Sequence, residues 1–205
     1  MSALKKHAAV TAESRALVVG SRGFLVLGVA AVVLIGREPV PLSGRGSVGD
    51  IAALGTAFLG FAAVVAGSLQ RTEHDLPPAP AEGRTRKIID IAALALAHAS
   101  IFLLGWLALF ALFQRAFVGA VLYPLAGAII VGITGAISVY MGYLSAITMN
   151  AYRLAGLLAV FLVTGVLTSM LTAEDPQWWQ EHLSALGASA DVSGVAFNVT
   201  LFVAG

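Results

Sequence analysis

Two ionisable residues lie inside or beside an apolar stretch, where a charge is costly. Asp90 is the third residue of a run that begins at Ile88, and His98 lies two helical turns further along. On a helix their spacing leaves the two side chains about 80° apart, so both could line one broad interior face. A proton relay would use such an arrangement. The alternatives are a helix-terminal Asp90, favoured by the helix dipole beside Arg86 and Lys87, and a neutral, hydrogen-bonded His98.

Arg84, Arg86 and Lys87 form a basic cluster directly before this run. Basic side chains next to a membrane helix can bind anionic lipid headgroups, at about 1 kcal/mol per charge. The same charges can instead act on membrane topology alone. The cluster is therefore a candidate headgroup site, with topology as the simpler alternative.

Small residues recur at every fourth position at Ala128, Gly132 and Ala136. This spacing lets two helix backbones approach closely in a membrane, where no hydrophobic force drives helices together. The stripe is either a seam between two copies of the chain or a contact between helices of one chain.

A polar segment near the end of the chain holds His182, Ser184 and Asp191, the side-chain types of a hydrolytic triad. On a short helix, however, residues two apart point about 200° apart, and no Gly-x-Ser-x-Gly elbow is present. Adjacent Glu181 and His182 are also poorly spaced for binding a metal. We predict no catalytic residue, no metal site and no cofactor. Asn198 follows in an apolar run and needs a hydrogen-bond partner there.

The composition identifies the class of protein that carries these residues. Of 205 residues, 59% are hydrophobic and only 11% are charged, and the mean hydropathy is +0.90. A soluble domain has about 25% charged residues. The composition therefore argues against a soluble globular enzyme and a disordered chain, and with a net charge of +1 no nucleic-acid partner is expected. The absence of cysteine excludes disulfides and thiolate metal sites.

Apolar runs of about 20 residues are long enough to cross a bilayer as helices. They predict an all-α, polytopic transmembrane helical bundle with five full spans and a truncated sixth. The predicted spans are 16–36, 50–69, 88–113, 117–148 and 154–172, followed by an outward loop over 173–193 and a partial span over 194–205. The last run is too short to cross, so we expect the sequence to be a fragment that ends inside a helix.

Basic residues are distributed unevenly over the predicted loops. Nine of the twelve lie on the side of the N-terminus and three on the other side. The positive-inside rule therefore predicts a multi-pass protein of the cell (inner) membrane with a cytoplasmic N-terminus.

The end of the chain also resembles a known family. The residues that carry the resemblance are His182-Leu-Ser184-Ala-Leu186-Gly187 and then Phe197-Asn198-x-x-Leu201-x-x-x-Gly205. They resemble the bacterial multi-pass family called domain of unknown function 998, over residues 153–205. The four-helix region 1–152 resembles an extension of some actinobacterial members. The resemblance implies a larger helical bundle and no established activity.

The expected function follows from these features. We predict a non-enzymatic integral membrane protein of uncharacterised role that binds, and could transport, a lipid or a small solute. The alternatives are a membrane enzyme that acts on lipid at the outer face and a scaffold subunit of a membrane complex. The expected partners are the lipid bilayer and anionic lipid headgroups, with a homo-oligomer or a membrane complex left open.

Overall fold

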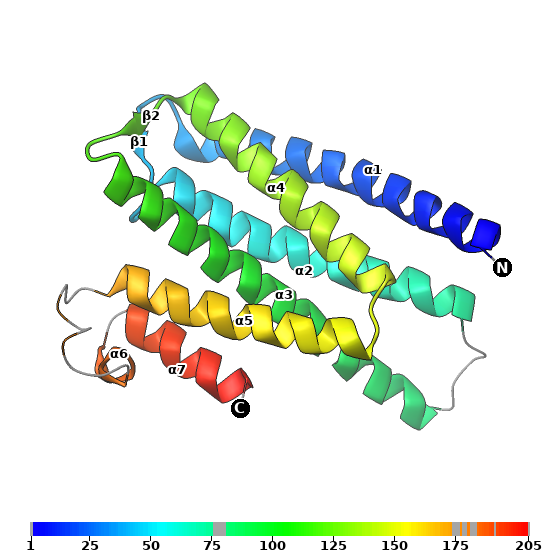
Figure 1. Ribbon diagram of the computed structural model, residues 1–205. Coiled ribbons are helices and arrows are strands. Elements are labelled where there is room, and N and C mark those ends of the chain that lie inside the picture. Colours follow the sequence, from blue (N-terminus) through cyan, green and yellow to red (C-terminus); the bar gives the residue numbers. More distant parts are fainter. Residues whose placement is uncertain are drawn as a thin grey trace.

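The computed structural model describes residues 2–75, 81–173, 177, 180, 184–190 and 192–204. These residues form an all-α helical bundle with one very short sheet, as the sequence predicts (Figure 1). In chain order the elements are α1 (Ser2–Ile35), β1 (Val40–Pro41), α2 (Val48–Asp75), α3 (Ala81–Ala116), β2 (Val121–Leu122), α4 (Pro124–Ile147), α5 (Ala151–Thr172), α6 (Ala185–Ala188) and α7 (Val192–Ala204).

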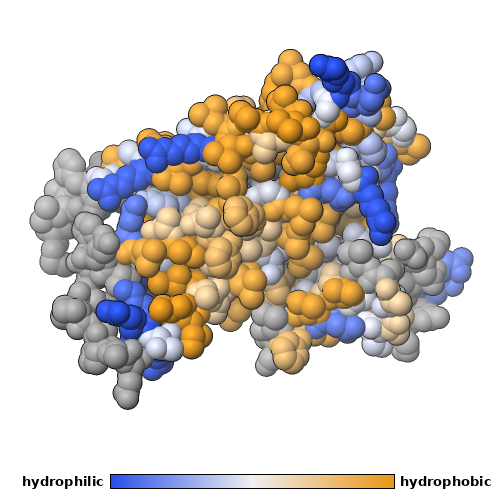
Figure 2. Space-filling view, turned by 180° about the vertical axis from the view of Figure 1, so that it is seen from behind, coloured by the Kyte–Doolittle hydropathy of each residue, from blue (hydrophilic) through white to orange (hydrophobic). Residues whose placement is uncertain are grey.

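Five of these helices are long and apolar enough to cross a membrane. The apolar parts are Val10–Ile35, Val48–Arg71, Gly83–Ala116, Pro124–Ile147 and Ala151–Thr172. Many of their large apolar side chains face outward, including Val33, which is 77% exposed. Figure 2 shows hydrophobic residues across the middle of one face of the molecule. The chain is therefore a multi-pass integral membrane protein, since only a bilayer covers such a surface favourably.

The helices do not pack in chain order. Helix α4 lies between α1 and α2, α3 packs on the other side of α2, and α5 and then α7 follow outward from α3 (Figure 1). The largest cluster of buried apolar side chains among the described residues joins α1, α2, α3 and α4, and it includes Leu27, Val48, Phe110 and Val131. Helix α1 therefore packs mainly on α4, and one side of it also faces the C-terminal end of α2.

Capping hydrogen bonds define where α2 and α5 begin. The Ser47 hydroxyl accepts from the backbone N–H of Asp50, and the Asp50 carboxylate accepts from the N–H of Gly46, both over 3.1 Å. Asn150 caps α5 by accepting from the N–H of Arg153 at 2.9 Å. The bonds that Ser47 and Asn150 accept satisfy helical N–H groups that have no partner within the helix, and the Gly46 bond fixes the turn just before α2.

The fourth span begins later than predicted. We expected a helix from Phe117, but α4 starts at Pro124. Gly119 has a φ of +75°, which ends the helical path, and Val121–Leu122 pairs antiparallel with Val40–Pro41. This segment is apolar without being helical, so hydropathy alone extends the span too far.

A side chain reinforces the same link between the first and third loops. The Gln114 amide oxygen accepts from the N–H groups of Leu42 and Ser43, at 3.0 and 3.2 Å. Both loops therefore lie at one end of the bundle, opposite the N-terminal end of α1 (Figure 1).

Candidate functional site

Asp90 and His98 occupy different environments on α3. Asp90 is exposed, and its carboxylate makes no hydrogen bond or ion pair within the part of the chain that the structure describes. His98 is only 4% exposed and faces the interior of the bundle. The two side chains therefore do not share an interior face, and nothing in their geometry supports a proton relay through this pair.

The His98 ring has a polar partner at each nitrogen. Nδ1 lies 2.9 Å from the carbonyl oxygen of Leu94, and Nε2 lies 2.9 Å from the hydroxyl of Ser145 on α4. A carbonyl can only accept, so in the neutral ring Nδ1 carries the proton and Nε2 accepts from Ser145. The histidine is thus fully hydrogen-bonded inside the bundle.

His98 is one of three α3 residues, four apart, that reach across to α4. Trp106 Nε1 donates to the buried Ser138 hydroxyl at 2.9 Å. Between them, Phe102 packs against glycines of α2 and α4: a methyl group on Gly60 of α2 would lie 2.3 Å from its ring, and one on Gly142 of α4 would lie 3.4 Å from it. The backbones of α3 and α4 stay apart, and these side chains bridge them.

The basic cluster at the start of α3 lies on the surface. Arg84 and Arg86 are exposed and Lys87 is half-buried. None of the three makes an ion pair with any residue in the described ranges. They lie at the same end of the bundle as the N-terminal part of α1 (Figure 1).

The small-residue stripe of α4 contacts α1 of the same chain. A methyl group on Gly28 would lie 3.6 Å from both the Ala128 carbonyl oxygen and Gly132 Cα. A methyl group on Gly20 would lie 3.1 Å from the Ala136 carbonyl oxygen. The stripe therefore serves close packing of α4 on α1.

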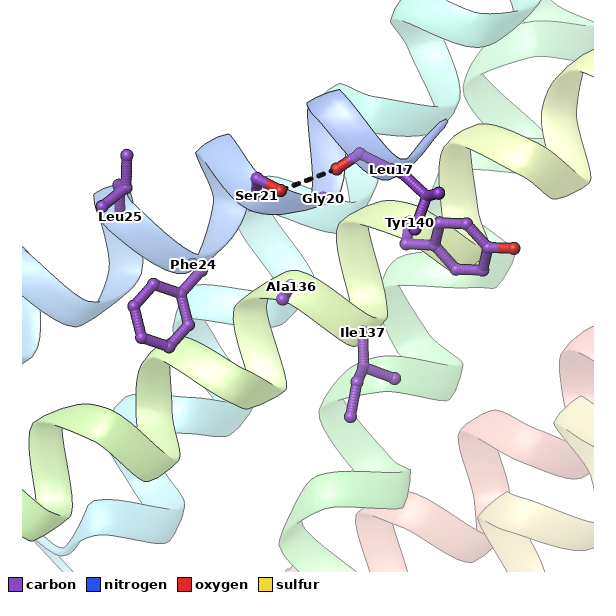
Figure 3. Close-up of a pocket in the computed structure, with 8 residues that line it drawn as sticks. All are labelled: Leu17, Gly20, Ser21, Phe24, Leu25, Ala136, Ile137 and Tyr140. Atoms are coloured by element: carbon purple, nitrogen blue, oxygen red, sulfur yellow. Dashed lines mark hydrogen bonds between the residues drawn. The ribbon is translucent and has the colours of Figure 1, made fainter. Parts of the chain in front are cut away.

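An apolar groove runs along one side of this seam. It encloses about 540 Å³ and is lined by Leu17, Gly20, Ser21, Phe24, Leu25, Ala136, Ile137 and Tyr140. Figure 3 shows Ala136 between the larger Phe24 and Tyr140 side chains. The Ser21 hydroxyl donates to the Leu17 carbonyl at 2.9 Å, so the one hydroxyl of the α1 wall is satisfied within α1.

The groove continues along the seam towards the β1–β2 end. A second hollow of about 160 Å³ shares Phe24 and Leu25 with the first. It extends along Gly28, Val29 and Val32 of α1 and Leu125, Ala128 and Ile129 of α4. The two hollows form an apolar track, which we call the α1–α4 groove.

The candidate residues near the end of the chain are only partly described. His182 and Asp191 lie outside the described residues, and Ser184 is exposed just before α6. Asn198 has the partner it needs, because its amide donates to the Gly187 carbonyl at 2.9 Å. A methyl group on Gly187 would lie 2.8 Å from Asn198 Oδ1, so glycine admits this contact.

Buried hydroxyl groups join α5 to α7, and sequence reasoning missed them. Ser169 and Ser193 each donate to the other's carbonyl oxygen, at 2.7 and 2.8 Å. Thr200 lies where a side chain on Gly165 would be. Serine and threonine are common in membrane helices, so their types alone do not reveal which pairs meet.

No group of three or more histidine, cysteine, aspartate or glutamate side chains comes together within the described ranges. The groove residues also escaped prediction, apart from the small-residue spacing of α4 that forms one wall. Comparison with protein-family models, curated proteins and solved structures found no match to this chain.

Proposed function

We propose that this protein is a non-enzymatic integral membrane protein that binds a bilayer lipid, with an acyl chain in the α1–α4 groove. The observation that carries the proposal is the groove itself, a hollow of about 540 Å³ in the membrane-spanning part of α1. Ligand sites of small molecules have volumes of about 300–1,000 Å³ and mostly apolar walls.

Shape distinguishes this groove from an ordinary lipid-facing surface. Lipid chains are as apolar as leucine, so specific binding depends on close packing rather than on the hydrophobic effect. Gly20 and Ala136 form a low floor, and Leu17, Phe24 and Tyr140 rise around it. A chain lying in the hollow contacts protein atoms on several sides, which a flat helix face does not offer.

The proposal is tested by filling the hollow. Ser21→Phe places a ring in the groove, and Val33→Phe makes a comparable change on α1 at an exposed residue that lines neither hollow. Lipid retained after mild purification would be counted by native mass spectrometry. We expect Ser21→Phe to lose the retained lipid and Val33→Phe to keep it. Equal retention by both variants, with equal thermal stability, would contradict the proposal.

We also propose that the N-terminus is cytoplasmic and that the protein resides in the cell membrane. The end of the bundle that holds the N-terminal part of α1 carries most of the described basic side chains, namely Arg15, Arg22, Arg71, Arg84, Arg86, Lys87 and Arg153. The opposite end carries Arg37, Arg45 and Arg115. By the positive-inside rule, the end with more basic residues is the cytoplasmic one.

We further propose that residues 153–205 are related to domain of unknown function 998. The proposal rests on the sequence pattern alone; in this chain the two halves of that pattern meet, because the Asn198 amide donates to the Gly187 carbonyl. A determined structure of a family member should contain this amide-to-carbonyl hydrogen bond. A member in which the two positions lie far apart would contradict the relationship.

A further inference from the structure

A second cavity of about 540 Å³ lies on the other flank of α1, and its character is different. It is lined by Thr11, Ser14, Arg15, Val18, Val19 and Arg22 of α1, with Gln70 of α2 and Tyr143 of α4. It shares no lining residue with the α1–α4 groove. We call it the arginine cavity.

Its two arginines have no acidic partner among the residues whose side chains the structure describes. Neither Arg15 nor Arg22 makes a hydrogen bond or an ion pair with any residue in the described ranges. Glu13 is the nearest carboxylate in sequence, but it lies two positions from Arg15 on a helix and does not line the cavity. The spacing of seven residues places both arginines on the same side of α1, facing the same hollow.

Arg22 also lies deep in the apolar part of α1. Thirteen residues separate it from Ile35 at the far end of the helix, a rise of about 20 Å. A bilayer core is about 30 Å thick. If Ile35 lies at the far boundary of the core, the Arg22 backbone lies about 10 Å inside the boundary on the N-terminal side. A guanidinium at that depth is costly unless it reaches water or an anion.

The rest of the cavity carries further polar groups, of which the Thr11 and Ser14 hydroxyls lie on the α1 wall. Tyr143 is 2% exposed, and its hydroxyl donates to the Gln70 amide oxygen. Guanidinium groups bind phosphate oxygens in pairs of parallel hydrogen bonds, which makes arginine the side chain best suited to such a ligand.

We infer that the arginine cavity binds the phosphodiester headgroup of an anionic glycerophospholipid, in the leaflet at the N-terminal end of α1. The other basic residues at this end, including Arg71 and Arg153, disfavour the cationic group of a zwitterionic headgroup. The inference rests on the proposed function only in taking the ligand to be a lipid, because the two sites are separate.

The test compares charge removal inside and outside the cavity. Arg15→Gln and Arg22→Gln, singly and together, would be compared with Arg71→Gln/Arg153→Gln, which removes the same charge from the same end of the bundle at residues that do not line the cavity. Binding of phosphatidylglycerol to the purified protein in phosphatidylcholine nanodiscs would be measured. We expect a loss of about 5-fold for each cavity arginine and about 30-fold for both, with the control changing less than about 3-fold.

Charge-conserving variants separate this role from folding. Arg15→Lys/Arg22→Lys should retain most of the anionic-lipid binding, whereas the glutamine pair should lose it at unchanged thermal stability in phosphatidylcholine. Equal losses in the cavity and control pairs would overturn the inference, and so would equal affinity for phosphatidylcholine. Competition by millimolar inorganic phosphate or glycerol 3-phosphate would point to a soluble phosphate and overturn the lipid assignment.

A groove variant keeps the two proposals distinguishable. Ser21→Phe should lose the chain-bound lipid and keep the preference for phosphatidylglycerol, because it does not line the arginine cavity. If Arg15→Gln/Arg22→Gln binds phosphatidylglycerol as well as the unaltered protein while Ser21→Phe loses its retained lipid, the headgroup inference is contradicted and the proposed function is not.

Discussion

At the scale of single residues, two side chains of α3 show how buried polar groups in the bundle find partners on another helix. His98 meets Ser145, and Trp106 meets Ser138, each across 2.9 Å between α3 and α4. Without water in the bilayer core, a polar group left unpaired is costly. These contacts explain how a buried histidine is tolerated in the bundle.

The His98–Ser145 hydrogen bond should appear as a coupling energy. We expect a double-mutant cycle of His98→Ala and Ser145→Ala to give about 0.6 kcal/mol, the average for hydrogen bonds between membrane helices. Unfolding free energies in detergent and denaturant would supply the four values. A matched cycle of His98→Ala with Ser138→Ala, which share no hydrogen bond, should give a value near zero. Equal couplings in the two cycles would contradict this assignment.

At the scale of elements, the position of α1 depends on how closely it approaches α4. Methyl groups on Gly23 and Gly135 would each meet a backbone carbonyl of the opposite helix within 2.9 Å. Such close approach maximises dispersion contacts, which drive helix association where lipid removes the hydrophobic contribution. The α1–α4 groove and the arginine cavity both depend on this seam, since α1 forms one wall of each.

Adding a single methyl group should therefore act differently on two glycines. Gly23→Ala places Cβ 2.9 Å from the Gly135 carbonyl and 2.8 Å from a Val139 methyl, so we expect a loss of about 1–3 kcal/mol. Gly156→Ala, on α5 with open space around it, should lose nothing, because alanine favours helix over glycine. Thermal unfolding in detergent checks both. A Gly23→Ala protein as stable as Gly156→Ala would show that the seam is looser than described.

The sequence predicts where the helical spans lie, but it does not predict which spans pack against each other. Five runs are found because each contains enough consecutive apolar residues to cross a bilayer, a purely local property. The predicted start of the fourth span at Phe117 is wrong, because hydropathy carries no information on the turn at Gly119 or on the pairing of Val121 with Pro41. The spacing of the α4 stripe indicates close packing but carries no information on which helix packs there.

At the scale of the whole molecule, charge and packing give the bundle two unlike ends. The N-terminal end of α1 lies with the C-terminal end of α2 and the start of α3, and most basic residues are there (Figure 1). The opposite end is joined by the β1–β2 pair. The arginine cavity could not be predicted from sequence, because its walls come from α1, Gln70 of α2 and Tyr143 of α4, and local hydropathy carries no information on which helices pack together.

The absence of cysteine makes the predicted topology directly measurable. Single cysteines at the exposed positions Glu38 and Val118 should react with a membrane-impermeant maleimide on intact cells. Arg71→Cys and Tyr152→Cys should react only after the membrane is permeabilised, because these positions lie at the other end of the bundle. Inverted labelling would reverse the orientation. A split within either pair would contradict the five-span arrangement itself.

The most direct test of lipid binding is to map where a lipid chain lies. A phospholipid with a photoactivatable group in its acyl chain would be crosslinked to the protein in the membrane, and the labelled peptides would be sequenced. We predict label concentrated on residues 17–25 of α1 and 136–140 of α4, and loss of this label in Ser21→Phe. Label spread evenly over exposed apolar positions such as Val33, Leu54 and Phe58 would contradict a specific lipid site.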